Sequence, residues 1–358
     1  MCAKFAFKNI KISGISTVVG ENKIDIDDEL IYYNNDQKQL DKLKKSIGFK
    51  TRYITNPNTT TFDLCLSASK KLLYKMHILA SDIDVIISVT QTPDYHMPGN
   101  AHLIHKALGC ENSTVCYDLE FGCSGFIMGL LNAFLFVNAG MKRVLLLTGD
   151  TLSKIINIKN RADAPIFGDS GSACIIEKTK EDSPSFFVVQ SDGKGSEIMF
   201  KKAGAYRYPS SEETKRNYID KNGNVRCQED FYMDGFDTFS FTLSTQPKLL
   251  KDTLEFSGKS VDDIDYYILH QANNYIVQTI VKKMNIDLAK APTGTFSKYG
   301  NQSSASIPST ICNDLSQSFK TKRQVLMQGF GIGLSWGACQ TEFSDITIIE
   351  PSIYKGET

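Results

Sequence analysis

Short runs of hydrophobic residues alternate with polar, turn-forming segments along the whole of this 358-residue chain. In the first half, a β-branched run at 85–89 and an apolar run at 143–148 predict buried strands, and 115–117 is also strand-like. We expect a helix over 100–108, and a longer apolar helix that begins near Cys123. This alternation of strands and helices is typical of an α/β fold whose helices cover mostly parallel sheets.

The second half of the chain repeats the same order of elements. It contains, in chain order, a predicted strand, two predicted helices and two further strands, at 266–269, 273–284, 304–319, 324–328 and 336–343. A turn-rich loop around 299–301 separates the two helices, and a glycine-rich bend separates the last two strands. The repeated order predicts an ancient duplication that gives two similar α/β halves.

One apolar segment imitates a membrane span, because 121–141 contains no charged residue. The segment also contains several glycines and lies between two predicted strands, so a buried central helix is the better interpretation. The N-terminus has no apolar signal core. We therefore expect a protein that does not enter a membrane.

The charged residues exclude strong long-range attraction to nucleic acid or anionic membranes, since 40 basic and 40 acidic side chains give zero net charge. The nine cysteines include no C-x-x-C pair, which favours a reduced, cytoplasmic protein. His102 and His105 share a helical face, but no third ligand lies nearby in the sequence, so no metal site is predicted.

Residues 190–235 are polar and have no clear periodicity. Two interpretations remain open for them: a surface excursion, or loops that roof a substrate channel.

Cys123 is a candidate nucleophile because it lies between a predicted strand and a long apolar helix. The unpaired backbone N–H groups and the positive dipole end at a helix N-terminus favour a thiolate. Gly122, Ser124 and Gly125 are small enough for a ligand to approach the backbone. The alternative is a buried, inert cysteine, which is the usual environment of this residue type.

His270 and Asn301 are candidate partners of that cysteine. His270 closes an apolar strand, and ligands of α/β sheets bind at the carboxyl ends of strands. A histidine there can exchange protons near neutral pH, although a structural histidine is the common alternative. Asn301 lies in a turn, where asparagine often serves only local geometry.

The bend at 329–333 could be simple packing between strands, or it could present backbone N–H groups as an oxyanion hole. A phosphate-binding loop is disfavoured, because a strand follows the bend and no Gly-Lys-Ser/Thr sequence is present.

Five segments together resemble β-ketoacyl-acyl carrier protein synthase III, a condensing-enzyme family with the thiolase fold. They occur in the family's order, at 118–126, 167–171, 270–273, 299–308 and 329–337. The resemblance implies two duplicated α/β halves stacked as five αβαβα layers. It divides the chain into an N-terminal half that carries the cysteine, lid loops, and a C-terminal half that carries the histidine and asparagine, at 1–180, 181–235 and 236–358.

The resemblance also implies a two-stage reaction. Cys123 takes an acyl group from a primer thioester, and malonyl-acyl carrier protein then loses carbon dioxide and attacks the acyl-cysteine. His270 and Asn301 hydrogen-bond the malonyl thioester, and the backbone N–H groups of Cys123 and Ile332 hold the acyl oxyanion. Phe330 and Gly331 contact the substrate. No cofactor is implied beyond acyl-CoA or acyl carrier protein thioesters as substrates.

Several positions depart from the family pattern at the coenzyme A site. Lys42 stands where the family has an adenine-contacting tryptophan, and Lys50 and Tyr275 replace arginines. Arg161 matches the arginine that helps to stack the adenine. Two carriers for the primer acyl group therefore stay open, coenzyme A and a carrier protein.

The resemblance further implies a homodimer, in which Met97 crosses the interface to close the partner's acyl pocket. Lys282 and Lys283 match a basic pair thought to meet acyl carrier protein, although a solvated helix end is the alternative.

Two other functions compete with condensation. A thiolase-fold acyltransferase would pass the acyl group from Cys123 to a hydroxyl or amine of a sugar or specialised metabolite. A non-catalytic homologue would act as a binding module, which the intact Cys-His-Asn set disfavours. No second cysteine occupies a matching motif, which favours decarboxylative condensation over thiolysis.

Overall fold

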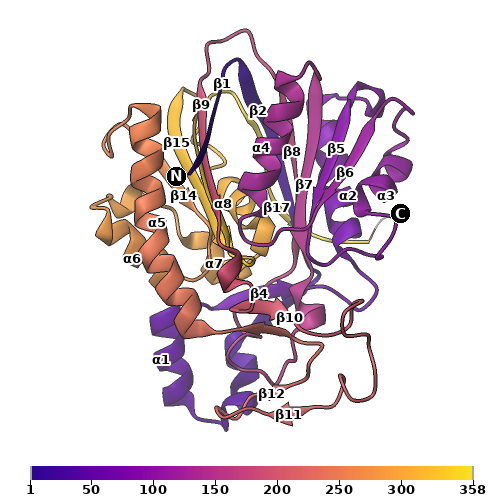
Figure 1. Ribbon diagram of the computed structural model, residues 1–358, viewed down its shortest axis with the longest axis vertical. Helices are drawn as coiled ribbons and strands as arrows, with labels where there is room; N and C mark the ends of the chain where they lie inside the picture. Colours follow the sequence, from indigo (N-terminus) through magenta and orange to yellow (C-terminus); the bar gives the residue numbers. More distant parts are fainter. Residues whose placement is uncertain (1, 357–358) are drawn as a thin grey trace.

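Two stacked sheets carry the fold in a computed structural model, which describes residues 2–356 (Figure 1). The six-stranded sheet has, from edge to edge, β17 (Thr347–Ile353), β2 (Ile10–Val19), β8 (Ser170–Lys178), β7 (Arg143–Asp150), β5 (Val85–Val89) and β6 (Val115–Leu119). The five-stranded sheet has β1 (Ala3–Phe7), β9 (Ser185–Ser191), β16 (Ser335–Phe343), β15 (Arg323–Gly331) and β14 (Tyr266–Leu269). Each sheet mixes parallel and antiparallel pairs.

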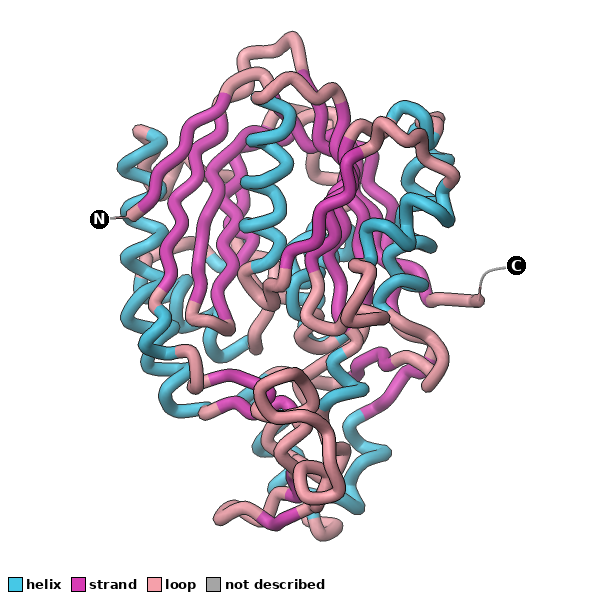
Figure 2. The backbone as a smooth tube through the Cα atoms, turned by 45° about the vertical axis from the view of Figure 1, so that its right-hand side comes forward, coloured by secondary structure: helices cyan, strands magenta, loops and turns pink. Residues whose placement is uncertain are grey.

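Helices form three layers around and between these sheets. Helices α4 (Gly125–Asn138) and α8 (Ser306–Asp314) lie in the middle and contact both sheets. The outer face of the six-stranded sheet is covered by α2 (Thr61–Met76) and α3 (Asn100–Leu108), and that of the five-stranded sheet by α5 (Gly235–Ser257), against which α6 (Asn274–Lys283) packs (Figure 2). The predicted αβαβα thiolase fold is confirmed.

The middle helix α4 accounts for the uncharged segment at 121–141. Phe126, Ile127, Leu130 and Phe134 are all fully buried in the core between the sheets. A helix that is hydrophobic on every side is expected in such a position. Within residues 2–356, no helix combines the length and the apolarity that crossing a bilayer requires.

The two halves exchange their terminal strands. The N-terminal strand β1 pairs with β9 in the five-stranded sheet, and the C-terminal strand β17 pairs with β2 in the six-stranded sheet. The chain divisions at 180 and 235 therefore do not separate the sheets.

One predicted helix is shorter than expected. The segment 304–319 is α-helical only over Ser306–Asp314. The reason is that Phe319 returns to the core, where its ring lies 5.0 Å from that of Phe343.

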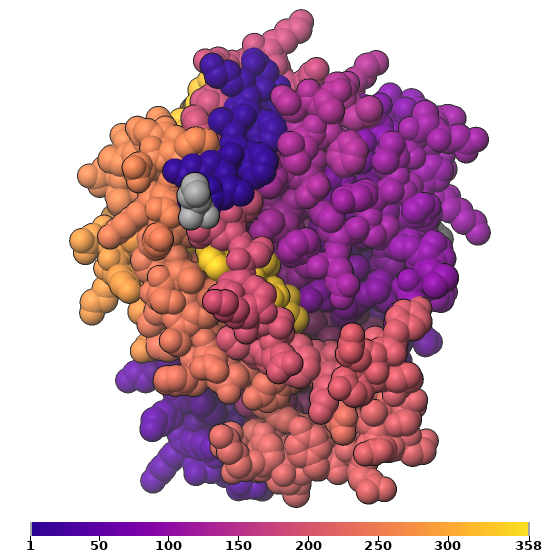
Figure 3. Space-filling view, viewed as in Figure 1, coloured from indigo at the N-terminus to yellow at the C-terminus, as the bar shows by residue number. Residues whose placement is uncertain are grey.

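The excursion at 190–235 forms two small two-stranded antiparallel sheets at one end of the molecule, β10 (Met199–Lys201) with β13 (Phe231–Met233) and β11 (Tyr218–Ile219) with β12 (Val225–Arg226) (Figures 1 and 3). The same end carries β3 (Asn22–Asp25), α1 (Gln37–Ile47) and β4 (Thr51–Ile54).

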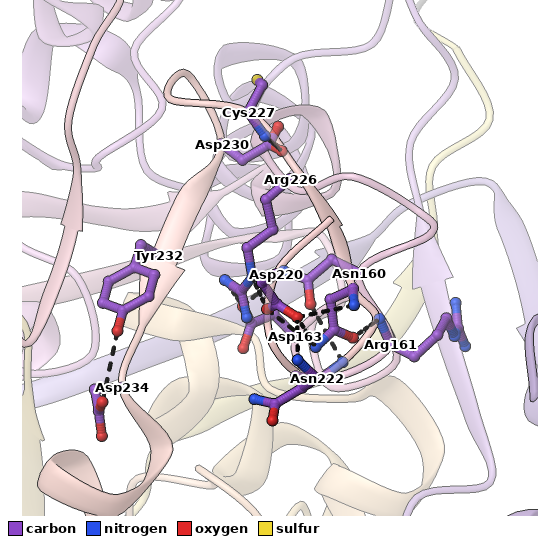
Figure 4. A network of polar contacts seen from close by, with 12 residues as sticks. Asn160, Arg161, Asp163, Asp220, Asn222, Arg226, Cys227, Asp230, Tyr232 and Asp234 are labelled. Carbon is purple, nitrogen blue, oxygen red and sulfur yellow. Dashed lines mark hydrogen bonds and ion pairs between the residues drawn. The ribbon is translucent and has the colours of Figure 1, made fainter. Parts of the chain in front are cut away.

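Buried ion pairs fix the excursion to the rest of the fold. Arg226 pairs with Asp163 at 3.0 Å and with Asp220 at 2.9 Å (Figure 4). Asp220 also accepts the backbone N–H groups of Asn222 and Asn224. Only the pair with Asp163 leaves the excursion, and removing either of its partners would leave an uncompensated buried charge.

Candidate active site

Three distant segments of the chain meet at a narrow cavity of about 50 Å³. Cys123, His270 and Asn301 all line it, together with Gln91 and Ser303. The glycine-rich bend contributes Phe330, Gly331 and Ile332 to the same wall.

Cys123 lies just before α4, and its residue is only partly buried because it faces the cavity. The C-terminal end of β15 packs directly against it. A Cβ atom built on Gly331 would lie 2.7 Å from the Cys123 Cβ, and one on Gly329 would lie 2.9 Å from the Cys123 carbonyl oxygen. Only glycine permits such close approach, so the bend serves as the surface on which the cysteine sits.

The Asn301 loop is held in place by backbone contacts with the start of the Phe167–Gly171 motif. The Asn301 N–H donates to Ile166 O at 2.8 Å, and the Gly168 N–H donates to Asn301 O at 3.1 Å. A Cβ on Gly168 would lie 2.0 Å from Tyr299 O, so a side chain there would displace the loop. Asn301 Oδ1 accepts the Ser303 N–H at 2.9 Å. The amide nitrogen of the same side chain remains available as a donor.

His270 follows β14 and is 1% exposed. Its N–H donates to Gln328 O at 2.8 Å, yet neither ring nitrogen has a hydrogen-bond partner. The Phe330 ring meets the imidazole edge to face at 5.4 Å. Burial lowers the pKa of His270 to about 3, so the imidazole is neutral at physiological pH. An unpartnered polar group in a lined cavity is ready to bind a ligand.

The surroundings of Cys123 disfavour the charged form of its thiol. Burial raises the pKa of this thiol to about 12, and the Asp150 carboxylate acts in the same direction, while a hydrogen bond from the Ser303 side chain opposes them. Burial therefore acts against the thiolate that the helix N-terminus is predicted to favour, and that expectation stays a prediction.

Asp150, at the carboxyl end of β7, was not anticipated. It is 1% exposed, and it accepts the Gln91 N–H at 2.7 Å and the Ser304 hydroxyl at 3.2 Å. Like His270, Asp150 is a polar residue at the carboxyl end of a buried strand. This position in the sequence is the signal that could have identified it.

A wider chamber of about 920 Å³ adjoins the catalytic cavity and shares Gln91, Leu152 and Ile332 with it. Part of the excursion lines this chamber, including residues from Ser191 to Tyr206. Segment 207–226 contributes nothing to either lining, and the substrate-channel interpretation stays a prediction for 191–206.

Arg161 lies outside the linings of both chambers. Its guanidinium lies 5.0 and 4.8 Å from the ring centres of Tyr32 and Tyr33, and it pairs with Glu29 at 3.0 Å. Glu29 also pairs with Arg52 at 2.6 Å.

The other candidate binding residues are on the surface. Lys50 is exposed, and Met97, in the loop before α3, is 75% exposed. Lys282 and Lys283 are exposed at the end of α6, and the Lys283 ammonium donates to Leu243 O at 3.0 Å. Their predicted roles remain predictions.

The five layers and the cavity of cysteine, histidine and asparagine define the class of thiolase-fold condensing enzymes. Family models describe the same two regions: 3-oxoacyl-acyl-carrier-protein synthase III matches residues 117–195, and the C-terminal model of that synthase matches 254–343. The chain belongs to the 3-oxoacyl-acyl-carrier-protein synthase III family.

Individual relatives agree with this assignment. A Campylobacter jejuni protein named as a 3-oxoacyl-acyl-carrier-protein synthase 3 is 39% identical over 99% of both chains. The β-ketoacyl-acyl-carrier-protein synthase III of Clostridioides difficile is 34% identical over 81% of this chain and 86% of that protein. The crystal structure of a 3-oxoacyl-acyl-carrier-protein synthase from Burkholderia xenovorans superposes with a TM-score of 0.92, at 30% identity and 99% coverage of both chains.

Proposed function

We propose that this protein catalyses decarboxylative Claisen condensation of an acyl group with malonyl-acyl carrier protein. The observation that carries the proposal is the position of His270, buried with two unpartnered ring nitrogens in the same cavity as Cys123 and Asn301.

In the first stage, the sulfur of Cys123 attacks the primer thioester and the carrier thiol leaves. The backbone N–H groups of Cys123 and Ile332 stabilise the oxyanion of the tetrahedral adduct. The wide chamber next to the cavity accommodates the acyl chain.

In the second stage, malonyl-acyl carrier protein loses carbon dioxide, and the electron pair of the broken bond forms an enolate. Neutral His270 and the Asn301 amide donate hydrogen bonds to the enolate oxygen as its charge develops. The enolate carbon attacks the acyl carbonyl, the bond to sulfur breaks, and a 3-oxoacyl-acyl carrier protein leaves. A neutral imidazole suits this role, because it donates without carrying a charge into the dry cavity.

Acyl carrier protein meets the enzyme at Lys282 and Lys283. The primer arrives as acyl-CoA or on a carrier protein, near Arg161 and Lys50. The protein acts in the cytoplasm as a homodimer, with Met97 reaching the partner's acyl pocket.

An exposed edge strand supports the dimer. Val115 and Tyr117 on β6, which ends the six-stranded sheet, are 43% and 42% exposed. An exposed edge strand with apolar side chains is a template for pairing with a second chain.

The test is product analysis with a panel of acyl thioesters and malonyl-acyl carrier protein labelled at its free carboxyl group. Condensation gives labelled carbon dioxide and a 3-oxoacyl-acyl carrier protein in equal amounts. Transfer of the acyl group to a hydroxyl or amine without carbon dioxide release identifies the competing acyltransferase.

A further inference from the structure

The passage between the two cavities contains one polar side chain. The residues that line both the catalytic cavity and the wider chamber are Gln91, Leu152, Met199, Phe231 and Ile332. Four of these side chains are apolar, so among residues 2–356 only Gln91 brings hydrogen-bonding groups to both linings. An acyl chain that extends from Cys123 into the chamber passes this carboxamide.

The backbone at Gln91 is held in place by the buried carboxylate of Asp150. Gln91 follows the end of β5 by two residues, and its N–H donates to Asp150 Oδ1 at 2.7 Å. The hydroxyl groups of Thr90 and Thr92 donate to the same oxygen at 3.1 and 3.3 Å. The Thr92 hydroxyl also accepts the Thr151 N–H at 2.9 Å. Asp150 therefore fixes the point from which the Gln91 side chain extends.

The carboxamide of Gln91 lies beside the backbone that precedes the nucleophile. A Cβ atom built on Gly122 would collide with Gln91 Oε1 and would lie 3.2 Å from Ile332 Cγ2. Glycine at this position leaves the space that the carboxamide occupies. Gln91 and Ile332 therefore both contact the residue next to Cys123.

This carboxamide has no partner within the protein. Gln91 is partly buried, and neither of its side-chain polar atoms forms a hydrogen bond with any residue in 2–356. An alkyl chain that covered the carboxamide would remove its water and give it no partner, which is unfavourable. A substrate with a hydrogen-bonding group at this point would replace the water.

The chamber beyond the passage is also partly polar. Its lining includes the side chains of Tyr95, His96, Asp118, Glu120, Lys201 and Tyr206. The rings of His96 and Tyr206, which come from distant segments of the chain, lie 5.6 Å apart. A few polar groups in an otherwise apolar pocket are the usual means by which a site selects its ligand.

We propose that Gln91 binds the primer and selects a hydroxyacyl group, with its hydroxyl on the second or third carbon, over a plain alkyl-acyl group. The proposal rests on the role of Cys123 as the acyl acceptor. The first carbon of the acyl group is bonded to the sulfur, so the second and third carbons are the atoms that reach the passage. Their hydroxyl donates to Gln91 Oε1 or accepts from Gln91 Nε2.

Paired primers test the selection. Butyryl, 2-hydroxybutyryl and 3-hydroxybutyryl thioesters, each on coenzyme A and on acyl carrier protein, are compared by rapid quench and mass spectrometry of Cys123. We expect kcat/KM for acylation to be about tenfold higher for the better hydroxyacyl primer than for butyryl, the effect of one neutral hydrogen bond.

Gln91→Met removes the carboxamide and keeps an unbranched side chain of similar length. We expect the preference to disappear, because acylation by the hydroxyacyl primer slows by about tenfold whereas acylation by butyryl does not slow. Gln317→Met, at an exposed glutamine that lines neither cavity, is the matched control and retains the preference.

The outcomes distinguish this inference from the proposed function. A wild-type kcat/KM for butyryl that equals or exceeds that of both hydroxyacyl primers overturns the selection and leaves the condensing function intact. The same holds if Gln91→Met slows all three primers alike, because the side chain then only shapes the passage. Thermal unfolding checks the fold of this variant, and if it does not fold, Gln91→Leu and the wild-type comparison decide the matter. An enzyme that forms no acyl-cysteine with these or any other acyl thioesters overturns the proposed function as well.

Discussion

The two flanks of Cys123 differ in how completely their polar groups are paired. On one flank, Asp150 accepts several hydrogen bonds from the protein itself. On the other, neither ring nitrogen of His270 has a hydrogen-bond partner. The side chain of Asn301 forms a hydrogen bond through Oδ1 and not through its amide nitrogen. Under the proposed function, the side with unpaired groups is the one that has donors available for a substrate.

Loss of the sulfur between the flanks has the largest expected effect. Cys123→Ala removes the acyl acceptor, so we expect no acyl-enzyme and a loss of condensation on the order of 10⁴-fold or more. The measurement is formation of 3-oxoacyl-acyl carrier protein. Cys110→Ala, a cysteine outside the cavity, retains activity as the control.

Substitution of His270 or Asn301 should separate acylation from condensation. His270→Ala and Asn301→Ala each remove one donor to the enolate, so carbon dioxide release falls on the order of 10²–10³-fold. Acylation of Cys123 proceeds at nearly the wild-type rate. Equal loss of both stages in either variant would contradict the division of roles.

A methyl group can disturb the sulfur without touching either flank. The Cβ of Gly331→Ala would lie 2.7 Å from that of Cys123. We expect acylation to slow by about tenfold or more and the free energy of unfolding to fall by about 1–3 kcal/mol. In Gly235→Ala the new Cβ meets no atom within 4 Å, so both quantities should stay near wild type.

The carrier-protein surface has a smaller effect. In Lys282→Glu/Lys283→Glu, kcat/KM for malonyl-acyl carrier protein falls by about tenfold at low salt, and the deficit shrinks as salt screens the charges. Acylation by a small synthetic thioester is unchanged. A deficit independent of salt, or one matched by Lys320→Glu, would argue against docking at α6.

A change of pH, acting through His270, has the smallest expected effect on the reaction. The folded pKa of His270, about 3, lies below its ordinary 6.5, so the decarboxylation rate stays flat from pH 8 to 5. The neutral buried imidazole contributes stability above pH 6.5, and this contribution is lost as pH falls from 6.5 toward 3. Urea unfolding of His270→Ala therefore depends less steeply on pH in that range.

The sequence pattern predicted the elements that are locally encoded. The β-branched run at 85–89 and the uncharged helix at 121–141 could be recognised because burial on both faces leaves continuous apolar segments. Cys123 and His270 each adjoin such a segment, whereas Asn301 lies in a turn and is selected only through the resemblance of its motif to the family.

Other features depend on contacts between distant segments. The strand β17 contains Pro351 at a sheet edge, which weakens its strand pattern. The raised pKa of the Cys123 thiol follows mainly from burial, which the local sequence does not reveal. The hydrogen bond from Ser304 to Asp150 joins positions 154 residues apart, and no local pattern reveals it.

The central claim is that Cys123 carries the acyl group, and intact-protein mass spectrometry with peptide mapping tests it most directly. After incubation with acyl-CoAs and acyl carrier proteins, the account predicts one acyl group on Cys123, which malonyl-acyl carrier protein removes as a 3-oxoacyl product. No adduct from either carrier, an adduct on another residue, or one that malonyl-acyl carrier protein leaves in place would contradict it.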